Sequence, residues 1–441
     1  ATTTVSERST DEGVIDCLII GAGVVGLAVA RELSVQGNSV VVLEKSQHIC
    51  DGASSGNSGL GCTGYDAPKG SLERALLRRS IMRHPNLYRS LGLSYNHVRK
   101  CGALVVAWTA EDLRSLKHIL EENIEAGDLE ARILSKVETL NLEKGLNQSA
   151  LGSVLCNREM VTEPWLVPVA YANSAILHGA KIFTENEVLH ASYDKNKRLW
   201  EIKTKESNTF YARTLINCGG LYGDKVDQMC NANEAAKEGE GEMQGKERGE
   251  MKEGLYKILP RKGQFIVFKG TALPSVSVSG ESDLDSTVSA SDKGPEYIIQ
   301  QVPSLQTKGI IVWKSVYGNV LCGPTAQEQE SRTDRASDQA TTEMLYNHAI
   351  NVYPSLANES NQRGERNGTG INIGEVIGTY SGIRPATQHR DYQIRLVPEM
   401  SFISVGGIRS TGLTAASGIA EYVHALVMEQ EHYKNGNVHS S

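Results

Sequence analysis

Short apolar runs alternate with segments of helical periodicity along most of the chain. Residues 15–20 form an apolar run of strand length, and apolar residues then recur at helical spacing as far as Gly37. Residues 39–44 predict a second buried strand. A strand, a glycine turn, a helix and a strand in about 30 residues make a βαβ unit. The beginning of the chain therefore predicts an α/β fold.

The same periodicities predict further elements, with turns between about 128 and 160. Gly219 and Gly220 follow one expected strand, and a second glycine pair follows another, so two more strand-to-helix turns are expected. The expected helices begin at 72, after a Ser71 cap, and cover 110–127, 165–179 and the segment after 412. Strands are expected at 103–108, near 181, 188, 200 and 210, and at 214–217, 264–270, 309–313 and 401–405.

Composition narrows the class of protein. The chain has 441 residues, with 45 Lys and Arg against 52 Asp and Glu, which gives a net charge of −7. This acidic balance argues against binding to nucleic acid or to anionic membranes, and no run of about 18 apolar residues predicts a transmembrane helix. The polar N-terminus does not resemble a secretory signal. Eight cysteines without a CxxC pair predict neither a disulfide framework nor a metal site. We expect a cytoplasmic protein, with mitochondria as the alternative.

One segment departs from the globular pattern. Residues 234–253 hold seven Glu and four basic residues without an apolar period. Such a composition buries little apolar surface. We expect a solvated, largely disordered surface insertion.

The glycine turn after the first strand has the spacing of a dinucleotide site. Gly21 permits the tight turn, Gly23 allows a pyrophosphate to approach the backbone, and Gly26 allows close packing of helix on strand. Glu44 ends the second strand, 23 residues after Gly21, where its carboxylate can accept hydrogen bonds from a ribose. An acidic residue there disfavours NADP, which leaves NAD or FAD.

Six segments together resemble a known family. They are DCLIIGAGVVGLAVAREL, SSGNSG, TLINCGGLYGD, PRKGQFIVF, SGIRPAT and VGGIRSTGLTAASGIAEYV. In this order they resemble the D-amino-acid-oxidase-type flavoproteins, above all the glycerol-3-phosphate dehydrogenase and oxidase branch, with L-2-hydroxyglutarate dehydrogenase close behind. The resemblance implies non-covalent FAD, because no cysteine matches a covalent attachment site.

The resemblance implies an α/β fold with an α+β substrate part. A discontinuous Rossmann-like FAD-binding domain is expected beside a substrate domain on an antiparallel sheet. The FAD-binding domain is expected to comprise 13–95, 166–232 and 379–430, and the substrate domain 96–165 and 255–378. The remaining segments are a disordered N-terminus at 1–12, the charged insertion at 233–254 and a disordered tail at 431–441.

The cofactor residues implied by the resemblance come from several segments. Val188 is expected to pass the adenine through its backbone, and the segment after residue 406 is expected to reach the flavin ring with a helix N-terminus. The full set is Gly21, Gly23, Gly26, Glu44, Lys45, Ser55, Asn57, Ser58, Gly59, Val188, Gly219, Gly220, Gly407, Gly412, Leu413 and Thr414.

The sequence departs from the family at the position expected to hold the catalytic base. Related glycerol-3-phosphate oxidases carry a histidine three residues beyond NSG, where this chain has Cys62. An alcohol needs a base for its O–H proton, and a thiol of pKa near 8.5 serves only when ionised. Cys62 is therefore either the base or a packed, unreactive thiol. Tyr65 and His389 are possible replacements.

The substrate side is expected to bind an anion. Arg384, in SGIRPAT, matches the family arginine that grips the substrate, and a guanidinium can fork onto a carboxylate or phosphate. A structural arginine is the alternative. Arg409 is expected to add positive charge with Ser410 as its hydrogen-bonding neighbour, and Lys308 also matches a family lysine. Lys262 is expected on a turn that opens a strand.

These residues favour an FAD-dependent enzyme that oxidises a small anionic 2-hydroxy compound by hydride transfer to flavin. The resemblance makes sn-glycerol 3-phosphate, oxidised to dihydroxyacetone phosphate, the first choice, with oxygen or a quinone as electron acceptor. Amine or amino-acid oxidation is the main alternative, because an amine that enters deprotonated needs no base. L-2-hydroxyglutarate oxidation and a degenerate flavin-binding relative remain open.

Overall fold

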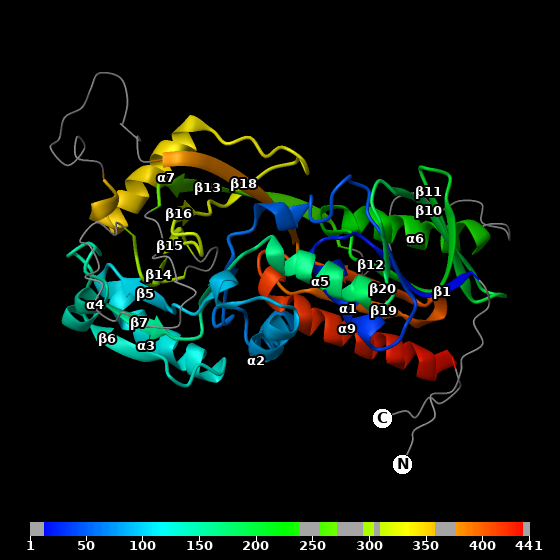
Figure 1. The fold of residues 1–441 in the computed structure, drawn as a ribbon, viewed down its shortest axis with the longest axis horizontal. Coiled ribbons are helices and arrows are strands. Elements are labelled where there is room, and N and C mark those ends of the chain that lie inside the picture. The colour runs from blue at the N-terminus through cyan, green and yellow to red at the C-terminus, as the bar shows by residue number, and fades with distance from the viewer. Residues whose placement is uncertain (1–12, 239–255, 271–293, 304–308, 358–375, 435–441) are drawn as a thin grey trace, which may run out of the picture.

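The structure is a computed structural model that describes residues 13–238, 256–270, 294–303, 309–357 and 376–434. In this part of the chain the strands form two large sheets and one small sheet. The two large sheets lie side by side in an elongated molecule, and each sheet with its helices is called a lobe (Figure 1). The long β13–β18 pair runs from one lobe toward the other.

The first sheet has a parallel centre. Its parallel strands are β1 (Val14–Ile20), β2 (Val40–Leu43), β9 (Lys181–Phe183), β12 (Thr209–Asn217) and β20 (Phe402–Gly406). Its antiparallel strands are β10 (Val188–Asp194), β11 (Leu199–Thr204) and β19 (Gln393–Val397). Segments far apart in the sequence therefore build one sheet, as expected.

Helices cover both faces of this sheet. Cys17 and Ile19 of β1 face the core under α1 (Val24–Val35), α2 (Leu72–Ser90), α5 (Leu166–Leu177) and α9 (Gly412–Lys434). Leu18 and Ile20 point to the other face, where Trp200 and α6 (Gly223–Glu238) pack. Because both faces are buried, β1 reads as a continuous apolar run.

The second sheet is largely antiparallel. Its strands are β5 (Ala103–Ala107), β6 (Arg132–Ser135), β7 (Gly152–Cys156), β13 (Ile258–Phe268), β14 (Ile298–Gln301), β15 (Ile311–Lys314), β16 (Val320–Gly323), β17 (Gln327–Glu328) and β18 (Val376–Thr387). Among the described strands of this sheet, only β5 and β14 pair in parallel. Helix α3 (Ala110–Glu125) covers one face, and α4 (Lys136–Leu142) and α7 (Gln339–Val352) cover the other.

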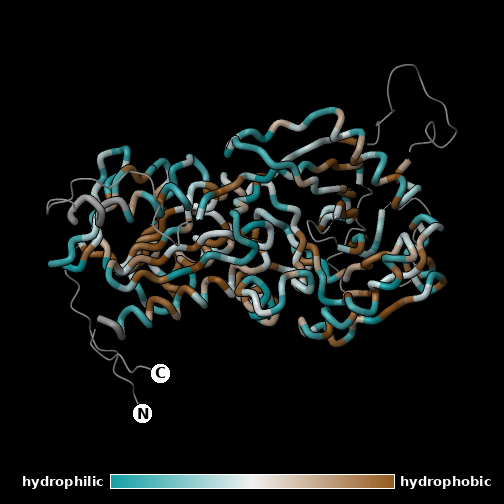
Figure 2. Tube along the Cα trace, turned by 180° about the vertical axis from the view of Figure 1, so that it is seen from behind, coloured by the Kyte–Doolittle hydropathy of each residue, from teal (hydrophilic) through white to brown (hydrophobic). Residues whose placement is uncertain are grey.

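A small antiparallel sheet connects the lobes. It consists of β3 (Leu60–Gly61), β4 (Val98–Arg99) and β8 (Met160–Thr162). Figure 2 shows hydrophobic segments running together along the strands inside each lobe, with hydrophilic segments toward the periphery. Each lobe therefore has its own core.

Local side-chain chemistry fixes where several helices begin. Ser71 caps α2 by accepting a hydrogen bond from the Arg74 backbone N–H, as expected. Thr109 and Asp112 form a capping box at α3. Helix α1 differs, because its N-cap is Gly23 and no side chain of that residue can accept from the first turn. The N-cap residue itself therefore binds none of the backbone N–H groups of the first turn.

Several predicted boundaries need correction. The segment 128–160, expected to be turns, contains β6, α4, β7 and the start of β8. Helix α6 continues to Glu238, so the charged insertion starts later than 234. Helix α9 continues to Lys434, into the tail expected to be disordered. The N-terminal segment 1–12 and the rest of the charged insertion lie outside the described residues.

The expected domain boundary at residue 379 falls inside β18. This strand pairs with β13 from Ile258 opposite Thr387 to Phe268 opposite Val376, so residues 376–387 belong to the second sheet. The expectation that residues 379–387, with the motif SGIRPAT, belong to the FAD-binding domain is therefore wrong. Arg384 therefore comes from the substrate-side sheet.

Candidate active site

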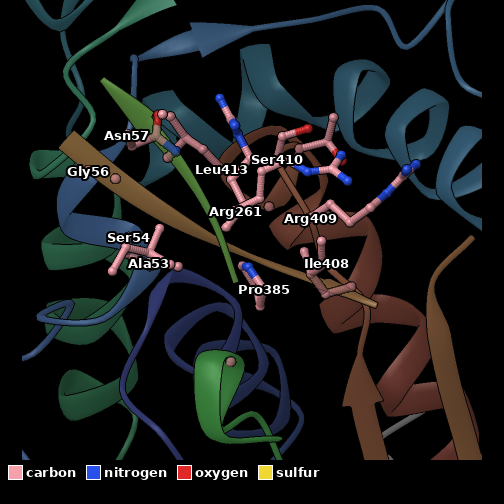
Figure 3. Close-up of a pocket in the computed structure, with 18 of the residues that line it drawn as sticks. Ala53, Ser54, Gly56, Asn57, Arg261, Pro385, Ile408, Arg409, Ser410 and Leu413 are labelled. Carbon is pink, nitrogen blue, oxygen red and sulfur yellow. The ribbon is translucent and has the colours of Figure 1, made fainter. Parts of the chain in front are cut away.

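A single continuous cavity of about 780 Å³ extends between the two large sheets. It reaches from the N-terminus of α1 past the N-terminus of α9 to β13, β14 and β18. In Figure 3, Ser54 and Asn57 lie on one side of the cavity, and Ile408, Arg409 and Ser410 lie on the other. Two helix N-termini thus face one space, which favours a ligand with negative charge at both points.

The glycine turn at α1 is as tight as the sequence predicts. Gly21 has a φ of +105°, and a Cβ there would lie 2.5 Å from the Cys218 carbonyl oxygen. A Cβ on Gly26 would collide with the Gly21 carbonyl oxygen, so this glycine allows the helix to pack on the turn. Gly23 borders the cavity, as expected of the residue that lets a ligand approach the backbone.

Ser54 is a residue that the sequence interpretation missed. Its Oγ accepts a hydrogen bond from the Val24 backbone N–H at 3.1 Å, and a Cβ on Gly23 would lie 3.3 Å from this oxygen. Ser54 directly precedes Ser55, the predicted cofactor residue of the SSGNSG motif. Loop spacing alone could not decide which of two adjacent serines faces the helix.

Glu44 fastens the turn and borders the cavity. Its carboxylate accepts from the Ala22 backbone N–H at 2.8 Å and from the Ser46 backbone N–H at 3.0 Å. Lys45 also borders the cavity and places its ammonium 3.3 Å from the centre of the Tyr222 ring. The ribose contact expected of Glu44 stays a prediction.

An ion pair ties the segment between β17 and α7 to this end of the cavity. Arg332 donates to both carboxylate oxygens of Asp224, at 2.6 and 2.8 Å, and to the Leu221 carbonyl. Burial alone would raise the pKa of Asp224, but Arg332 and the Ile258 and Lys225 backbone N–H groups hold it below its usual value. Arg335 donates to the Asp51 and Gly52 carbonyls. The segment bearing both arginines thus borders the nucleotide end.

The SSGNSG loop is brought to the cavity only in part. Asn57 and Ser58 border it, together with Gly56. Ser55 does not, because its Oγ donates to the Gly52 carbonyl at 2.8 Å. Gly59 lies behind the surface, with a φ of +75° and its N–H bonded to Asn57 Oδ1 at 2.7 Å. Direct cofactor contacts of Ser55 and Gly59 are therefore disfavoured.

The remaining predicted cofactor residues divide in the same way. Gly219, Gly220, Gly412 and Leu413 border the cavity. Three others do not belong to the described lining: Val188 lies in β10 opposite Thr204, Gly407 turns at a φ of +70° beside Gln393, and Thr414 receives a hydrogen bond from the Cys62 N–H at 3.3 Å.

Arg384 is placed at the cavity with an adjacent arginine. Both terminal nitrogens donate to the Thr325 carbonyl oxygen, at 3.2 and 3.1 Å. Burial, and then the charge of Arg261 opposite it on β13, lower the pKa of Arg384 to about 10. A Cβ on Gly263 would lie 2.6 Å from the guanidinium, so this glycine makes room for it. In the described part of the chain no carboxylate pairs with Arg384.

Arg261 was not predicted, although alternation along β13 contains the signal. Arg261, Gly263 and Phe265 border the cavity, at every second position of the strand. Lys262 points to the other face, where its Nζ donates to Asp334 at 3.0 Å. The expectation that Lys262 sits on a turn is wrong, since it lies inside β13.

Arg409 and Ser410 border the cavity, but not as the expected pair. Arg409 donates to Glu73 Oε2 at 2.9 Å, and the buried Glu73 also accepts from Thr411 Oγ1 at 2.7 Å. Ser410 is exposed to the cavity. The charge of Arg409 is therefore balanced by Glu73, and Ser410 is not its bonded neighbour.

The proposed replacements for the missing histidine have unequal positions. Cys62 borders the cavity, whereas Tyr65 is buried behind it and donates to Gln300 at 3.2 Å. Burial, with nearby Cys156 and acidic groups, raises the pKa of Tyr65 well above its usual range. His389 is exposed and is not part of the described lining. Lys308 lies outside the described residues.

Besides Asp51 and Glu73, two further carboxylates of the cavity lining were not predicted. Asp66 and Glu159 both border it, near Cys62. Glu159 is only 1% exposed. It comes from a turn before β8, far from every quoted motif, so no local pattern could place it here. Among the described residues, no group of three or more His, Cys, Asp or Glu could hold a metal ion.

The cavity fits a dinucleotide with a ring system at one end. Glycines leave the backbone bare at the N-terminus of α1, where Gly23 and Val24 border the space, and α9 presents Gly412 and Leu413 further along. Glu44 borders the same space. No helix in the described part of the chain is long and apolar enough to cross a membrane.

Comparisons with known proteins agree with this arrangement. The chain is 29% identical to "Glycerol 3-phosphate dehydrogenase" of Caloramator mitchellensis over 411 residues, covering 93% of this chain and 73% of the relative. It is 25% identical to "Glycerol 3-phosphate oxidase" of Mycoplasma pneumoniae over 414 residues, covering 92% of both. L-2-hydroxyglutarate dehydrogenases match about half of the chain, at 24% identity for the Homo sapiens protein.

Solved structures share the fold over nearly the whole chain. The FAD-bound L-alpha-glycerophosphate oxidase from Mycoplasma pneumoniae superposes with a TM-score of 0.74 at 24% identity, covering 94% of this chain and 95% of that one. Glycine oxidase from Geobacillus kaustophilus gives 0.71 at 18% identity, covering 95% of both. The family model "DAO: FAD dependent oxidoreductase" matches residues 16–426. The chain therefore belongs to the DAO family of FAD-dependent oxidoreductases.

Proposed function

We propose that this FAD-dependent oxidoreductase oxidises sn-glycerol 3-phosphate to dihydroxyacetone phosphate. The observation that carries the proposal is Arg384, a cavity-lining guanidinium that donates to the Thr325 carbonyl and whose cross-strand neighbour is another arginine. Like charges directly opposite each other on a sheet are destabilising. A substrate anion between them would offset that cost.

Arg384 suits a phosphate or carboxylate because its planar fork can donate two parallel hydrogen bonds. Arg261 already donates to Glu328 at 2.8 Å, which leaves Arg384 as the main anion anchor. Gly263 keeps the space in front of the guanidinium open. An anion held here would orient the rest of the substrate along the cavity toward Cys62 and the N-terminus of α9.

FAD supplies the hydride acceptor of such a reaction. The N-terminus of α9, at Gly412 and Leu413, would stabilise negative charge on the reduced ring system through its backbone N–H groups. The chain must also take up the hydroxyl proton of an alcohol. Relatives named as an oxidase support oxygen as the final electron acceptor, and a relative named as a dehydrogenase leaves a quinone as the alternative.

Amino-acid or amine oxidation is the second candidate. The observation that favours it is the presence of Asp66 and Glu159 in the same cavity as Arg384, an arrangement that could hold the two ends of a zwitterion. Cys62 at the family histidine position is also compatible with a substrate that needs no base. L-2-hydroxyglutarate, an alcohol with two carboxylates, would meet the same need for a base as glycerol 3-phosphate.

Anaerobic mixing separates these candidates. The oxidised flavin is followed by its visible absorbance after addition of sn-glycerol 3-phosphate, glycerol, L-2-hydroxyglutarate or each of a panel of amino acids. We expect bleaching by glycerol 3-phosphate and not by glycerol, because glycerol has no anion for Arg384. Bleaching by an amino acid alone would favour the second candidate. A flavin that none of these compounds bleaches would favour a flavin-binding protein without this activity.

A further inference from the structure

The segment between β17 and α7, residues 329–338, reaches from the substrate-side sheet to the nucleotide end of the cavity, and we call it the strap. Three of its residues, Arg332, Thr333 and Arg335, border the cavity. The strap contains no helix or strand, so side-chain contacts must hold it in place. The proposed oxidation gives none of these residues a task.

One side of the strap is fixed to the substrate-side sheet. Lys262, a buried residue on β13, donates from Nζ to Asp334 Oδ2 and to the Ala336 carbonyl, both at 3.0 Å. Ser381, on β18, donates from Oγ to the Arg335 carbonyl at 2.8 Å. Because β13 and β18 pair with each other, two neighbouring strands carry the strap.

The other side of the strap is attached to two segments that follow strands of the FAD-binding sheet. Arg332 donates to the Asp224 carboxylate and to the Leu221 carbonyl, after β12. Arg335 donates to the carbonyls of residues 51 and 52, after β2. Strands β12 and β2 are the two neighbours of β1 in the sheet. The strap is therefore attached on both flanks of the glycine turn that leads from β1 into α1.

We propose that the strap retains FAD, with the ion pair of Arg332 and Asp224 as its latch. A dinucleotide whose pyrophosphate binds the N-terminus of α1 would lie in the space that the strap borders. FAD then leaves only after the contacts of the strap arginines open. The inference depends on the cofactor and not on the identity of the substrate.

The latch has the features of a strong ion pair. Asp224 is 2% exposed, and Arg332 donates to both of its carboxylate oxygens, at 2.6 and 2.8 Å. Burial opposes ionisation of Asp224, but the bonds from Arg332 and from backbone N–H groups hold its pKa below the usual value, so the carboxylate is charged at neutral pH. Opening the pair would leave this buried charge without its arginine, which is unfavourable.

Arg395 offers a matched control. It donates at 3.1 Å to Asp227, a fully buried aspartate three residues further along α6. Neither Arg395 nor Asp227 belongs to the described cavity lining. Arg332→Gln and Arg395→Gln therefore each break an ion pair with a buried aspartate of α6, but only Arg332→Gln releases the strap.

The test follows the exchange of bound FAD for an excess of isotope-labelled FAD, counted by mass spectrometry, in wild type, Arg332→Gln, Arg332→Lys and Arg395→Gln. Hydrogen–deuterium exchange of residues 329–338 is recorded on the same FAD-loaded proteins. We expect Arg332→Gln to speed FAD exchange roughly 10- to 100-fold, the scale of lost bonds to a charged group, and to speed deuterium uptake in the strap. Arg332→Lys should give intermediate rates, because an ammonium cannot reproduce the fork. Arg395→Gln should match wild type in both measurements.

Three results would overturn the inference. Unchanged FAD exchange in Arg332→Gln, at any rate of deuterium uptake, would show that the strap does not retain the cofactor. Faster FAD exchange without faster deuterium uptake would mean that Arg332 contacts FAD directly, and equal acceleration in Arg395→Gln would assign the effect to α6. If Arg332→Gln does not fold or load with FAD, Arg332→Lys decides: acceleration of both exchanges supports the latch, and wild-type rates overturn it. Because no substrate is used, a flavin that glycerol 3-phosphate fails to reduce would overturn the proposed function alone.

Discussion

The backbone of Gly56 lies directly against the backbone of Gly382. A Cβ on either glycine would overlap atoms of the other, so the SSGNSG loop touches β18 two residues before Arg384. This contact joins the loop expected to cover the flavin to the strand that carries the proposed anion anchor. The distance between cofactor and substrate sites is therefore set by a contact that only glycine allows.

Gly382→Ala should disturb both sites at once. The added methyl group must displace the Gly56 backbone, and overpacking of this kind typically costs about 1–3 kcal/mol. We expect a lower melting temperature and a reduced FAD content. Gly378→Ala is the control on the same strand, because a Cβ there meets nothing within 4 Å. A Gly382→Ala protein as stable and as fully loaded with FAD as Gly378→Ala would refute the contact.

Gly23→Val should prevent FAD binding. The side chain would project toward Ser54 Oγ and into the space at the N-terminus of α1, where backbone N–H groups are needed by the pyrophosphate. The purified protein should be colourless, which absorbance and a count of bound FAD will show. The same substitution at Gly378 should leave the protein yellow. A fully loaded Gly23→Val protein would contradict the assigned nucleotide site.

Arg384→Lys should weaken capture of the substrate. A lysine is a point charge that cannot replace the bidentate fork, and the loss of charge-assisted bonds of about 1.5–3 kcal/mol predicts a fall of roughly a hundredfold in kcat/KM. Arg395→Lys, on β19, is the control, since Arg395 pairs with Asp227 rather than bordering the cavity. Unchanged kcat/KM in Arg384→Lys would mean that the anion binds elsewhere.

His84 should make stability dependent on pH. Burial, aided by the charge of Arg83 and opposed by a bond to the Thr414 carbonyl, lowers its pKa to about 4. The unfolded imidazole takes up a proton near pH 6.5, so the unfolded state binds more protons between pH 6.5 and 4. The free energy of unfolding should therefore decrease as the pH is lowered from 6.5 to 4, by up to about 3 kcal/mol from this residue.

Chemical denaturation at a series of pH values checks the role of His84. His84→Gln should flatten the dependence between pH 6.5 and 4, even though the loss of packing on Tyr88 lowers stability throughout. The same substitution at His178, which is exposed, tests whether the effect belongs to the buried imidazole. A wild-type slope retained in His84→Gln would show that other groups cause the pH dependence.

The nucleotide half of the fold was predictable because its signals are local. Residues 14–43 form a strand, a glycine turn, a helix and a strand within one short segment, and the turn requires glycine at Gly21 and Gly26 for steric reasons visible in the spacing. The helix after residue 412 also followed from periodicity, and in α9 Ile419 and Val423 are buried. In these segments sequence neighbours are also the packing neighbours.

The substrate half depends on contacts between distant segments, which periodicity does not contain. Glu159 and Gln300 meet although they are 141 residues apart, and β18 joins β13 across more than a hundred residues. Arg384 was found because a resemblance named it. Glu159 lies in no recognisable motif, and the sequence does not distinguish Ser54 from the adjacent Ser55. Side chains that border a cavity from separate strands need the tertiary structure to be found.

Analysis of the product of a single turnover tests the central claim most directly. The FAD-loaded protein is mixed anaerobically with excess sn-glycerol 3-phosphate, the flavin absorbance is recorded, and the products are quantified after quenching. The proposed function predicts one equivalent of dihydroxyacetone phosphate for each FAD reduced, with Arg384→Lys forming it far more slowly. A flavin that stays oxidised with glycerol 3-phosphate, yet is reduced by an amino acid with release of a keto acid and ammonia, would contradict the account.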